Sequence, residues 1–490
     1  MAVEWVFNAD SLFAPALFRD LFLDGGSPRA WSFPPPGFLP DLAVYFVFHG
    51  LALAVGLDYH FAVLVFGFAQ FVALCAGMVF FLIGATPVGR FRRGYFAAAV
   101  AALFMVFVAA ATQERFAFLP FLLIHHGSAM ALALWAGGCL VRGRWKSLAV
   151  LSAIGTFGDV LFFGFCVFPA LLAMIVAPPA RIAKRDRTRA LLICFLSAGL
   201  GRLLFGFVRA TDLFLLPALP VGSLVGELAT LDAFAARLGD SMLKLLVQVP
   251  PWYWPLFIVG VLSMRPSIGD PGRRTGVVFA LASAVIGLGL GFAGAVSQNQ
   301  NEPAARYMQP ALVFFPLYIS WSIFRSLPWK WKPVWVPPVS LLAAGVVGIL
   351  LGAPTRGTET DVAGVGACLA QQQRMVRDGL AGYAVSGPAN LRRRADGSSY
   401  RINAIDGGAG IRYWLNSAAW YGPGPDDSGA RTPRYDFILT RGLDEEMLRD
   451  RFGSPEWIVA CPGTDVWLYD APIEVFGPGE IRLWRTLIGR

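Results

Sequence analysis

The side chains most able to do chemistry in this 490-residue chain are carboxylates, arginines and histidines that interrupt apolar stretches. Asp10 lies just before an apolar segment, and an ionised carboxylate there could take a proton from a hydroxyl group as a general base. Aspartate is also a common helix N-cap, so the same residue could serve only to start a helix expected over 12–22. Both interpretations stay open for Asp10.

A guanidinium and a phenol form a second candidate site. Arg306 and Tyr307 directly precede the apolar segment 309–324, and the polar sequence 298–302 comes shortly before them. Arginine at the mouth of a helix could bind a phosphate group through two parallel hydrogen bonds. The alternative is an Arg-Tyr pair that anchors the helix end at the membrane interface.

Two adjacent histidines, His125 and His126, fall about two turns into a helix expected to begin near Leu119. Neighbouring positions on a helix point about 100° apart, so these two rings are not arranged to chelate one metal ion, and we expect no metal site. Each histidine could contact a substrate, and each could equally form a hydrogen bond between helices.

Arg202, Asp159 and Glu114 are charged residues within or beside apolar segments. A charge at this depth is costly unless it is paired or used. Arg202 therefore needs either a counter-charge, for which Asp159 is the simplest partner, or a lipid phosphate. Asp159 and Glu114 are candidate substrate-binding residues, with a structural ion pair as the alternative.

The composition indicates a protein that works in lipid. Hydrophobic residues make up 56% of the chain and charged residues only 15%, whereas soluble domains have about 25% charged residues. The net charge of +9 comes from the apolar part, because residues 1–353 hold 25 Lys and Arg against 15 Asp and Glu. Basic residues concentrated in short loops are typical of membrane topology rather than of nucleic-acid binding, so we expect no nucleic-acid partner.

The apolar runs predict a polytopic α-helical membrane protein with about ten crossings. Single crossings are expected at 61–83, 96–112, 119–141, 190–209, 251–264, 276–297, 309–324 and 334–353. The stretch 147–177 is too long for one crossing and is expected to go out and come back, with Asp159 at the outer turn. The stretch 42–57 is expected to lie at the outer surface as a helix.

Clusters of basic residues are expected on the cytoplasmic side. They are Arg90, Arg92 and Arg93; Arg142, Arg144 and Lys146; Arg181, Lys184, Arg185, Arg187 and Arg189; Arg265, Arg273 and Arg274; and Arg325, Lys330 and Lys332. The chain then divides into an extracytoplasmic loop with juxtamembrane helices (1–60), a transmembrane helical domain (61–353) and a soluble extracytoplasmic domain (354–490).

The C-terminal segment predicts a small α/β or α+β domain. Strands are expected at 435–440, 457–460 and 466–469, and a helix at 444–452. Cys368 and Cys461 are the two cysteines of this segment, and they could form a disulfide if the domain lies in an oxidising compartment.

The N-terminal pattern resembles the glycosyltransferase-C superfamily. The resemblance rests on Asp10 before a juxtamembrane helix, the Pro-rich turn 33–41 that ends in Asp41, a second juxtamembrane helix and the Arg306-Tyr307 pair. Members include protein mannosyltransferases and the lipid A aminoarabinose transferases. The family has a transmembrane helix before its first outer loop, so one more crossing is expected upstream of Asp10.

The resemblance implies an inverting glycosyltransferase in a bacterial plasma membrane. It would move a sugar from a polyprenyl-phosphate donor to a glycan, lipid or protein acceptor on the extracytoplasmic side. Asp10 is then the expected base, and Arg306, Tyr307 and Arg202 bind the donor phosphate. Asp41, His125, His126, Asp159 and Glu114 are candidate substrate-binding residues. No cofactor is expected to be required, and a divalent cation is open.

Two other classes of protein remain alternatives. A transporter or flippase of a lipid-linked envelope precursor would also be apolar and polytopic, although transporters favour internal repeats, and none is evident in this sequence. A non-catalytic protein of envelope polysaccharide assembly is the third possibility, and it would tolerate the loss of Asp10.

Overall fold

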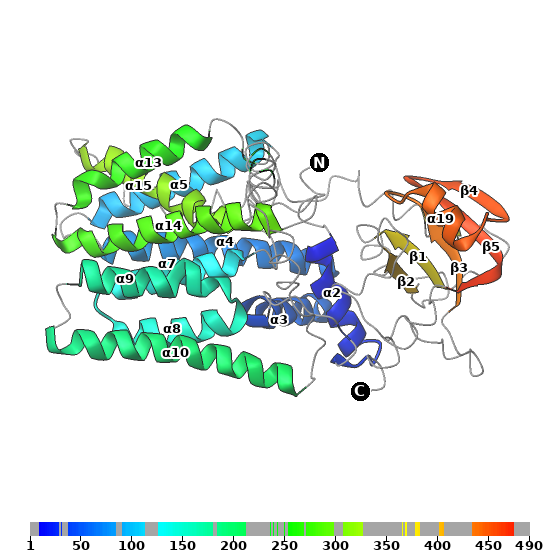
Figure 1. Ribbon diagram of the computed structural model, residues 1–490, viewed down its shortest axis with the longest axis horizontal. Helices are drawn as coiled ribbons and strands as arrows, with labels where there is room; N and C mark the ends of the chain where they lie inside the picture. Colours follow the sequence, from blue (N-terminus) through cyan, green and yellow to red (C-terminus); the bar gives the residue numbers. More distant parts are fainter. Residues whose placement is uncertain are drawn as a thin grey trace.

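The computed structural model describes residues 9–28, 31, 38–84, 91–112, 126–179, 184–211, 253–268, 271–297, 307–326, 378–382, 401–405 and 434–474, with single residues at 236, 239, 243, 249, 365, 368 and 369. These residues form a helical bundle and a small sheet domain. Figure 1 shows the sheet domain beyond the end of the bundle at which α2 and α3 lie.

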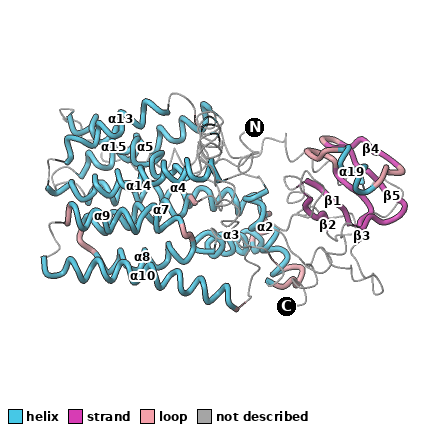
Figure 2. The backbone as a smooth tube through the Cα atoms, viewed as in Figure 1, coloured by secondary structure: helices cyan, strands magenta, loops and turns pink. Residues whose placement is uncertain are grey.

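The described helices follow the expected apolar runs closely. They are α2 (Ala9–Phe22), α3 (Ala43–Ala54), α4 (Tyr59–Gly84), α5 (Phe91–Thr112), α7 (Gly127–Val141), α8 (Trp145–Gly158), α9 (Phe168–Val176), α10 (Lys184–Ala210), α13 (Tyr253–Ile268), α14 (Pro271–Ser297) and α15 (Gln309–Ser326), with π-helical turns η2 (Phe38–Leu42) and η5 (Phe163–Val167). Figure 2 shows that this part of the chain is helical throughout, with short turns.

Three of the described helices are long and apolar enough to cross a membrane, at Tyr59–Gly84, Asp186–Ala210 and Arg273–Gly291. The ten expected crossings are therefore not shown. The other apolar helices are shorter; α7, for example, has 15 residues, or about 22 Å at 1.5 Å per residue, against a hydrocarbon core of about 30 Å. The expected crossing at 334–353 lies outside the described residues.

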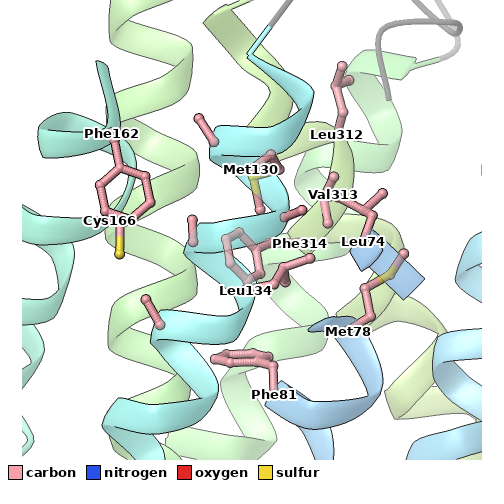
Figure 3. Close-up of a cluster of buried hydrophobic side chains, with 14 of the residues drawn as sticks. Leu74, Met78, Phe81, Met130, Leu134, Phe162, Cys166, Leu312, Val313 and Phe314 are labelled. Atoms are coloured by element: carbon pink, nitrogen blue, oxygen red, sulfur yellow. The ribbon is translucent and has the colours of Figure 1, made fainter. Parts of the chain in front are cut away.

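The core of the bundle is apolar and closely packed. Side chains of α4, α7 and α15 meet there, including Leu74, Met130 and Val313 (Figure 3). Phe81 lies edge-on to Phe314, with ring centroids 5.5 Å apart. In lipid there is little hydrophobic gain from helix association, so close van der Waals packing of this kind must hold the helices together.

The stretch 147–177, which was expected to go out and come back, reverses its direction at Asp159. α8 ends at Gly158, the chain turns at Asp159, and it returns through η5 and α9. The return pass is fastened to α14 by two hydroxyl groups: Ser283 donates to the carbonyl of Phe165 and Thr275 donates to the carbonyl of Ala177. Such hydrogen bonds between helices satisfy polar groups that water cannot reach.

Two described basic residues of the expected clusters lie near the ends of helices. Arg142, after α7, donates a hydrogen bond to the carbonyl of Phe80 near the end of α4. Arg273, near the start of α14, lies over the ring of Trp321 near the end of α15. Figure 1 shows the turn between α7 and α8 at the end of the bundle far from the sheet domain.

The sheet domain contains five strands in the order β2-β1-β3-β5-β4. The strands are β1 (Asp378–Gly382), β2 (Arg401–Ile405), β3 (Arg434–Leu439), β4 (Trp457–Cys461) and β5 (Thr464–Glu474). β2, β1 and β3 are parallel, whereas β5 pairs antiparallel with both β3 and β4. The domain therefore has the mixed sheet of an α+β or α/β domain.

Two apolar clusters cover the two faces of this sheet. Leu448 of the helix α19 (Glu445–Phe452) packs with Ile438 and Trp467 on one face. Leu369 packs with Phe437 and Leu468 on the other. A disulfide joins Cys368 to Cys461 and so ties the chain that covers this second face to the end of β4.

Candidate functional site

A buried carboxylate and a buried histidine meet where α7 and the turn after α8 come together. Oδ2 of Asp159 lies 2.5 Å from Nδ1 of His126. Each residue is only 6% exposed. Both residues are candidates from their sequence positions, but Arg202 rather than His126 was the expected partner of Asp159.

The backbone of His126 corrects one expectation. This residue has φ +63° and is the only non-glycine residue with positive φ among the described residues. The helix α7 begins at Gly127, so His126 does not lie two turns inside a helix that starts near Leu119. A left-handed backbone conformation is rare for a residue with a side chain and persists only where surrounding contacts hold it.

Asp159 is held by its own turn as well as by His126. Its Oδ1 accepts a hydrogen bond from the backbone N–H of Leu161 at 2.9 Å, and its own N–H donates to the carbonyl of Gly155. The carboxylate therefore caps the start of the return pass with one oxygen and binds the histidine with the other. Two independent constraints fix its position.

Tyr307 borders the same pair. Its ring centroid is 5.7 Å from that of His126. The close approach of α14 to this region depends on Gly287, where an added Cβ would meet Pro310 and the carbonyl of Tyr307. The structure thus brings one member of the Arg306-Tyr307 motif next to the histidine-carboxylate pair.

Arg202 lies on α10, which packs along α8. Its guanidinium sits 4.6 Å from the ring of Phe205 and is within electrostatic range of Asp159. The expected ion pair between Arg202 and Asp159 is not formed among the described residues, because the carboxylate faces His126 instead. The charge of Arg202 is therefore near the site but is not paired with the carboxylate of Asp159.

The structure describes two further candidate residues, Asp41 and Asp10. Asp41 is buried in η2, which packs against α8. Asp10 lies in the first turn of α2, which begins at Ala9; a carboxylate there favours helix formation through the helix dipole. Only the backbone of Asp10 is described.

Three candidates lie outside the described residues: Arg306, His125 and Glu114. Among the described residues, no group of three or more histidine, cysteine or acidic side chains could hold a metal ion.

Other buried polar contacts at this end of the bundle were not predicted from the sequence. Ser128 donates a hydrogen bond to Oε1 of Gln70 at 2.8 Å, and the hydroxyl of Tyr45 lies 3.1 Å from Nδ1 of His49. The residue type could have indicated one of these contacts, because Gln70 is a lone polar side chain in the middle of an apolar segment.

Comparisons of the chain with family models, curated proteins and solved structures find no match. The arguments about function therefore rest on the residues and contacts described above.

Proposed function

We propose that this protein is an inverting glycosyltransferase that moves a sugar from a polyprenyl-phosphate donor to a glycan, lipid or protein acceptor outside the plasma membrane. One observation carries the proposal. His126, Asp159 and Tyr307 come from three separate segments of an apolar bundle and lie together, the first two buried and the tyrosine half-buried. Polar groups buried in this way in a membrane bundle are costly and usually functional.

The chemistry required by such a transfer matches residue types that the sequence supplies. The departing lipid phosphate needs positive charge, for which Arg202 and Arg306 are available. The acceptor hydroxyl needs a base, and the carboxylate of Asp10 remains our candidate. Attack from the face opposite the leaving phosphate would invert the anomeric carbon. No step requires a metal or an organic cofactor.

The disulfide supports an extracytoplasmic sheet domain. Disulfides persist in oxidising compartments such as the bacterial periplasm and are rare in the cytosol. The sheet domain carries the Cys368–Cys461 bridge, whereas the four free cysteines lie in the helical part and are buried. The proposed topology is a multi-pass protein of a bacterial inner membrane with this domain outside.

The decisive experiment for the transferase is Asp10→Asn in the full chain. Near-complete loss of sugar transfer with unchanged yield and melting temperature is expected, because the amide cannot accept the proton. Asp24→Asn is the matched control, since Asp24 is an exposed carboxylate after α2. Normal transfer by Asp10→Asn would reject Asp10 as the base.

Arg306→Ala tests the donor-binding role. Loss of a guanidinium that binds phosphate should raise the apparent KM for the lipid donor by about tenfold or more. An unchanged KM would favour the role of Arg306 as an interfacial anchor.

A transporter or flippase of a lipid-linked precursor is the second candidate. Transporters build their sites at interrupted helices, and the return pass after Asp159 includes the π-helical turn η5 before α9. Movement of a lipid-linked sugar across proteoliposomes without transfer to any acceptor would favour this alternative.

A further inference from the structure

The strand β4 forms an open edge of the sheet domain. Among the described residues it pairs with β5 on one side and with no strand on the other. An edge strand presents every second N–H and C=O group outward, where an added strand can pair with them. The opposite edge strand differs, because residues 402–405 of β2 are all buried. The sheet is therefore covered at β2 and accessible to another chain at β4.

Apolar side chains are exposed on both faces of the open edge. Trp457 and Ile458 are each 51% exposed. They lie on opposite faces of the sheet, since Trp457 is paired with Leu468 of one apolar cluster and Ile458 with Trp467 of the other. Natural edge strands often carry lysine or proline as protection against further pairing, whereas β4 has the sequence WIVAC, without either. An apolar edge of this kind is typical of a protein interaction site.

The hairpin formed by β4 and β5 carries only negative charge. Residues 452–474 include four carboxylates and no lysine or arginine. Three of these carboxylates, on Glu456, Asp465 and Asp470, are exposed. Glu456 directly precedes β4 and accepts a hydrogen bond from the backbone N–H of Asp470 at 3.0 Å, whereas Asp465 is paired with Ala460 near the other end of β4. Carboxylates therefore lie at both ends of the open edge.

The arginines of the neighbouring helix α19 do not pair with these carboxylates. The guanidinium of Arg449 lies over the ring of Trp467 and is 3.6 Å from the carboxylate of Glu445. Within the described part of the chain, Glu456 and Asp465 form no ion pair. Their negative charge is available to a partner of opposite charge, which would be attracted to the edge and oriented on it.

We infer that β4 binds an extended segment of a partner polypeptide, which adds to the sheet as a further strand and carries apolar residues in its centre and basic residues at its ends. The backbone of the segment pairs with β4, its apolar side chains cover Trp457 and Ile458, and its basic side chains meet Glu456 and Asp465. A second copy of the same edge fits less well, because it would bring the carboxylates of two chains together.

Binding of synthetic peptides to the full chain in detergent tests the inference. The probe is a fluorescent peptide with valine and threonine in its centre and lysine at both ends, and its affinity is measured by fluorescence anisotropy. One control peptide has glutamate in place of lysine, and another has a methyl group on every backbone nitrogen. Only the lysine peptide should bind saturably, and added salt should weaken its binding. Equal affinity of either control peptide would overturn the inference.

A substitution on the edge tests where the peptide binds. Ile458→Lys should weaken binding of the lysine peptide by about tenfold or more, because it places a like charge on the open edge. Met447→Lys is the matched control, since Met447 is an exposed apolar residue of α19, and this variant should bind as the unmodified chain does. Unchanged affinity in Ile458→Lys would overturn the inference.

A second pair of variants tests the charge. Glu456→Gln should weaken binding of the lysine peptide by about threefold, because glutamine keeps an oxygen for the N–H of Asp470 but loses the negative charge. Glu446→Gln, in the first turn of α19, is the control and should leave the affinity unchanged. If Ile458→Lys does not fold, this pair decides the matter, and equal affinity of the two glutamine variants overturns the inference.

Self-association of the chain distinguishes the other occupant of the edge. Native mass spectrometry without peptide should show the same oligomeric state for the unmodified chain and for Ile458→Lys. A dimer of the unmodified chain that is lost in Ile458→Lys would assign the edge to a second copy and overturn the inference. None of these measurements involves sugar transfer, so their outcome is independent of the proposed function.

Discussion

Gly201 of α10 packs directly against Thr156 of α8. A Cβ added to Gly201 would collide with the hydroxyl of Thr156 and with the carbonyl of Ala153. The same hydroxyl bridges the two helices, since Thr156 Oγ1 lies 3.0 Å from the carbonyl oxygen of Ala198. The two helices therefore approach each other closely because a glycine faces a small polar residue, as is common in membrane bundles.

Gly201→Ala should destabilise the bundle by about 1–3 kcal/mol, because the added methyl group forces the two helices apart. Gly199→Ala is the matched control, with open space at its Cβ position, and it should be neutral or slightly stabilising through helix propensity. Melting temperatures in detergent would measure both changes. Equal effects of the two substitutions would contradict close α8–α10 packing at Gly201.

The buried pair of His126 and Asp159 predicts a large coupling energy. Asp159→Ala should cost about 3 kcal/mol, because it removes the hydrogen-bond partner of a buried histidine and the acceptor of the Leu161 N–H. Asp159→Asn should cost less, since the amide oxygen can still accept that bond. A double-mutant cycle with His126→Gln checks the coupling, and purely additive costs would show that the pair does not interact.

His49 predicts a dependence of stability on pH. Burial lowers the pKa of His49 to about 4, against a partly opposing effect of the Asp58 charge. The unfolded chain takes up a proton near its ordinary pKa of about 6.5, whereas the folded chain does so only near pH 4. The free energy of unfolding should therefore fall as the pH drops from about 6.5 to 4, by at most roughly 3 kcal/mol.

Melting curves of the unmodified chain and of His49→Gln across this pH range would check the effect. The glutamine variant should lose this part of the pH dependence and can still bond to the Tyr45 hydroxyl. An unaltered pH profile in His49→Gln would be inconsistent with a buried, neutral His49.

The disulfide predicts a local loss of stability when it is removed. Cys368 and Cys461 are 93 residues apart in the chain, and removal of a bridge over such a loop typically costs about 2–4 kcal/mol. Cys368→Ser and Cys461→Ser should each make the sheet domain more sensitive to protease while the bundle stays resistant. Reduction of the unmodified chain should have the same effect, and equal protease resistance with and without reductant would contradict the prediction.

In the sheet domain, local sequence patterns predicted some of the strands but not all of them. β3, β4 and β5 were predicted because short runs rich in apolar and aromatic residues lie there, and Pro462-Gly463 marks the turn between β4 and β5. β1 and β2 were not predicted. β1 has the sequence DGLAG, which lacks β-branched residues, and it is a strand because it lies between β2 and β3 as a central strand. Tertiary context overrode its weak propensity.

In the candidate site, the sequence predicted which residues matter but not which of them contact each other. Residue type singled out Asp159, His126, Arg202 and Tyr307, since polar side chains in apolar segments stand out without any structure. The predicted partner of Asp159 was wrong. Whether Asp159 binds Arg202 or His126 depends on the turn at residue 159 and on the left-handed backbone at His126. Neither feature has a local sequence signature.

The sequence by itself determined that this chain has long apolar helices of membrane-spanning length and a small folded C-terminal domain, because hydrophobicity and charge act residue by residue and can be summed along the chain. It also determined most helix positions, because apolar runs are local. Only the tertiary structure decided that His126 faces Asp159, that Tyr307 stands beside them and that Cys368 joins Cys461. Such pairings depend on how helices and strands distant in the sequence are rotated and shifted against one another, and packing of the whole chain sets those positions.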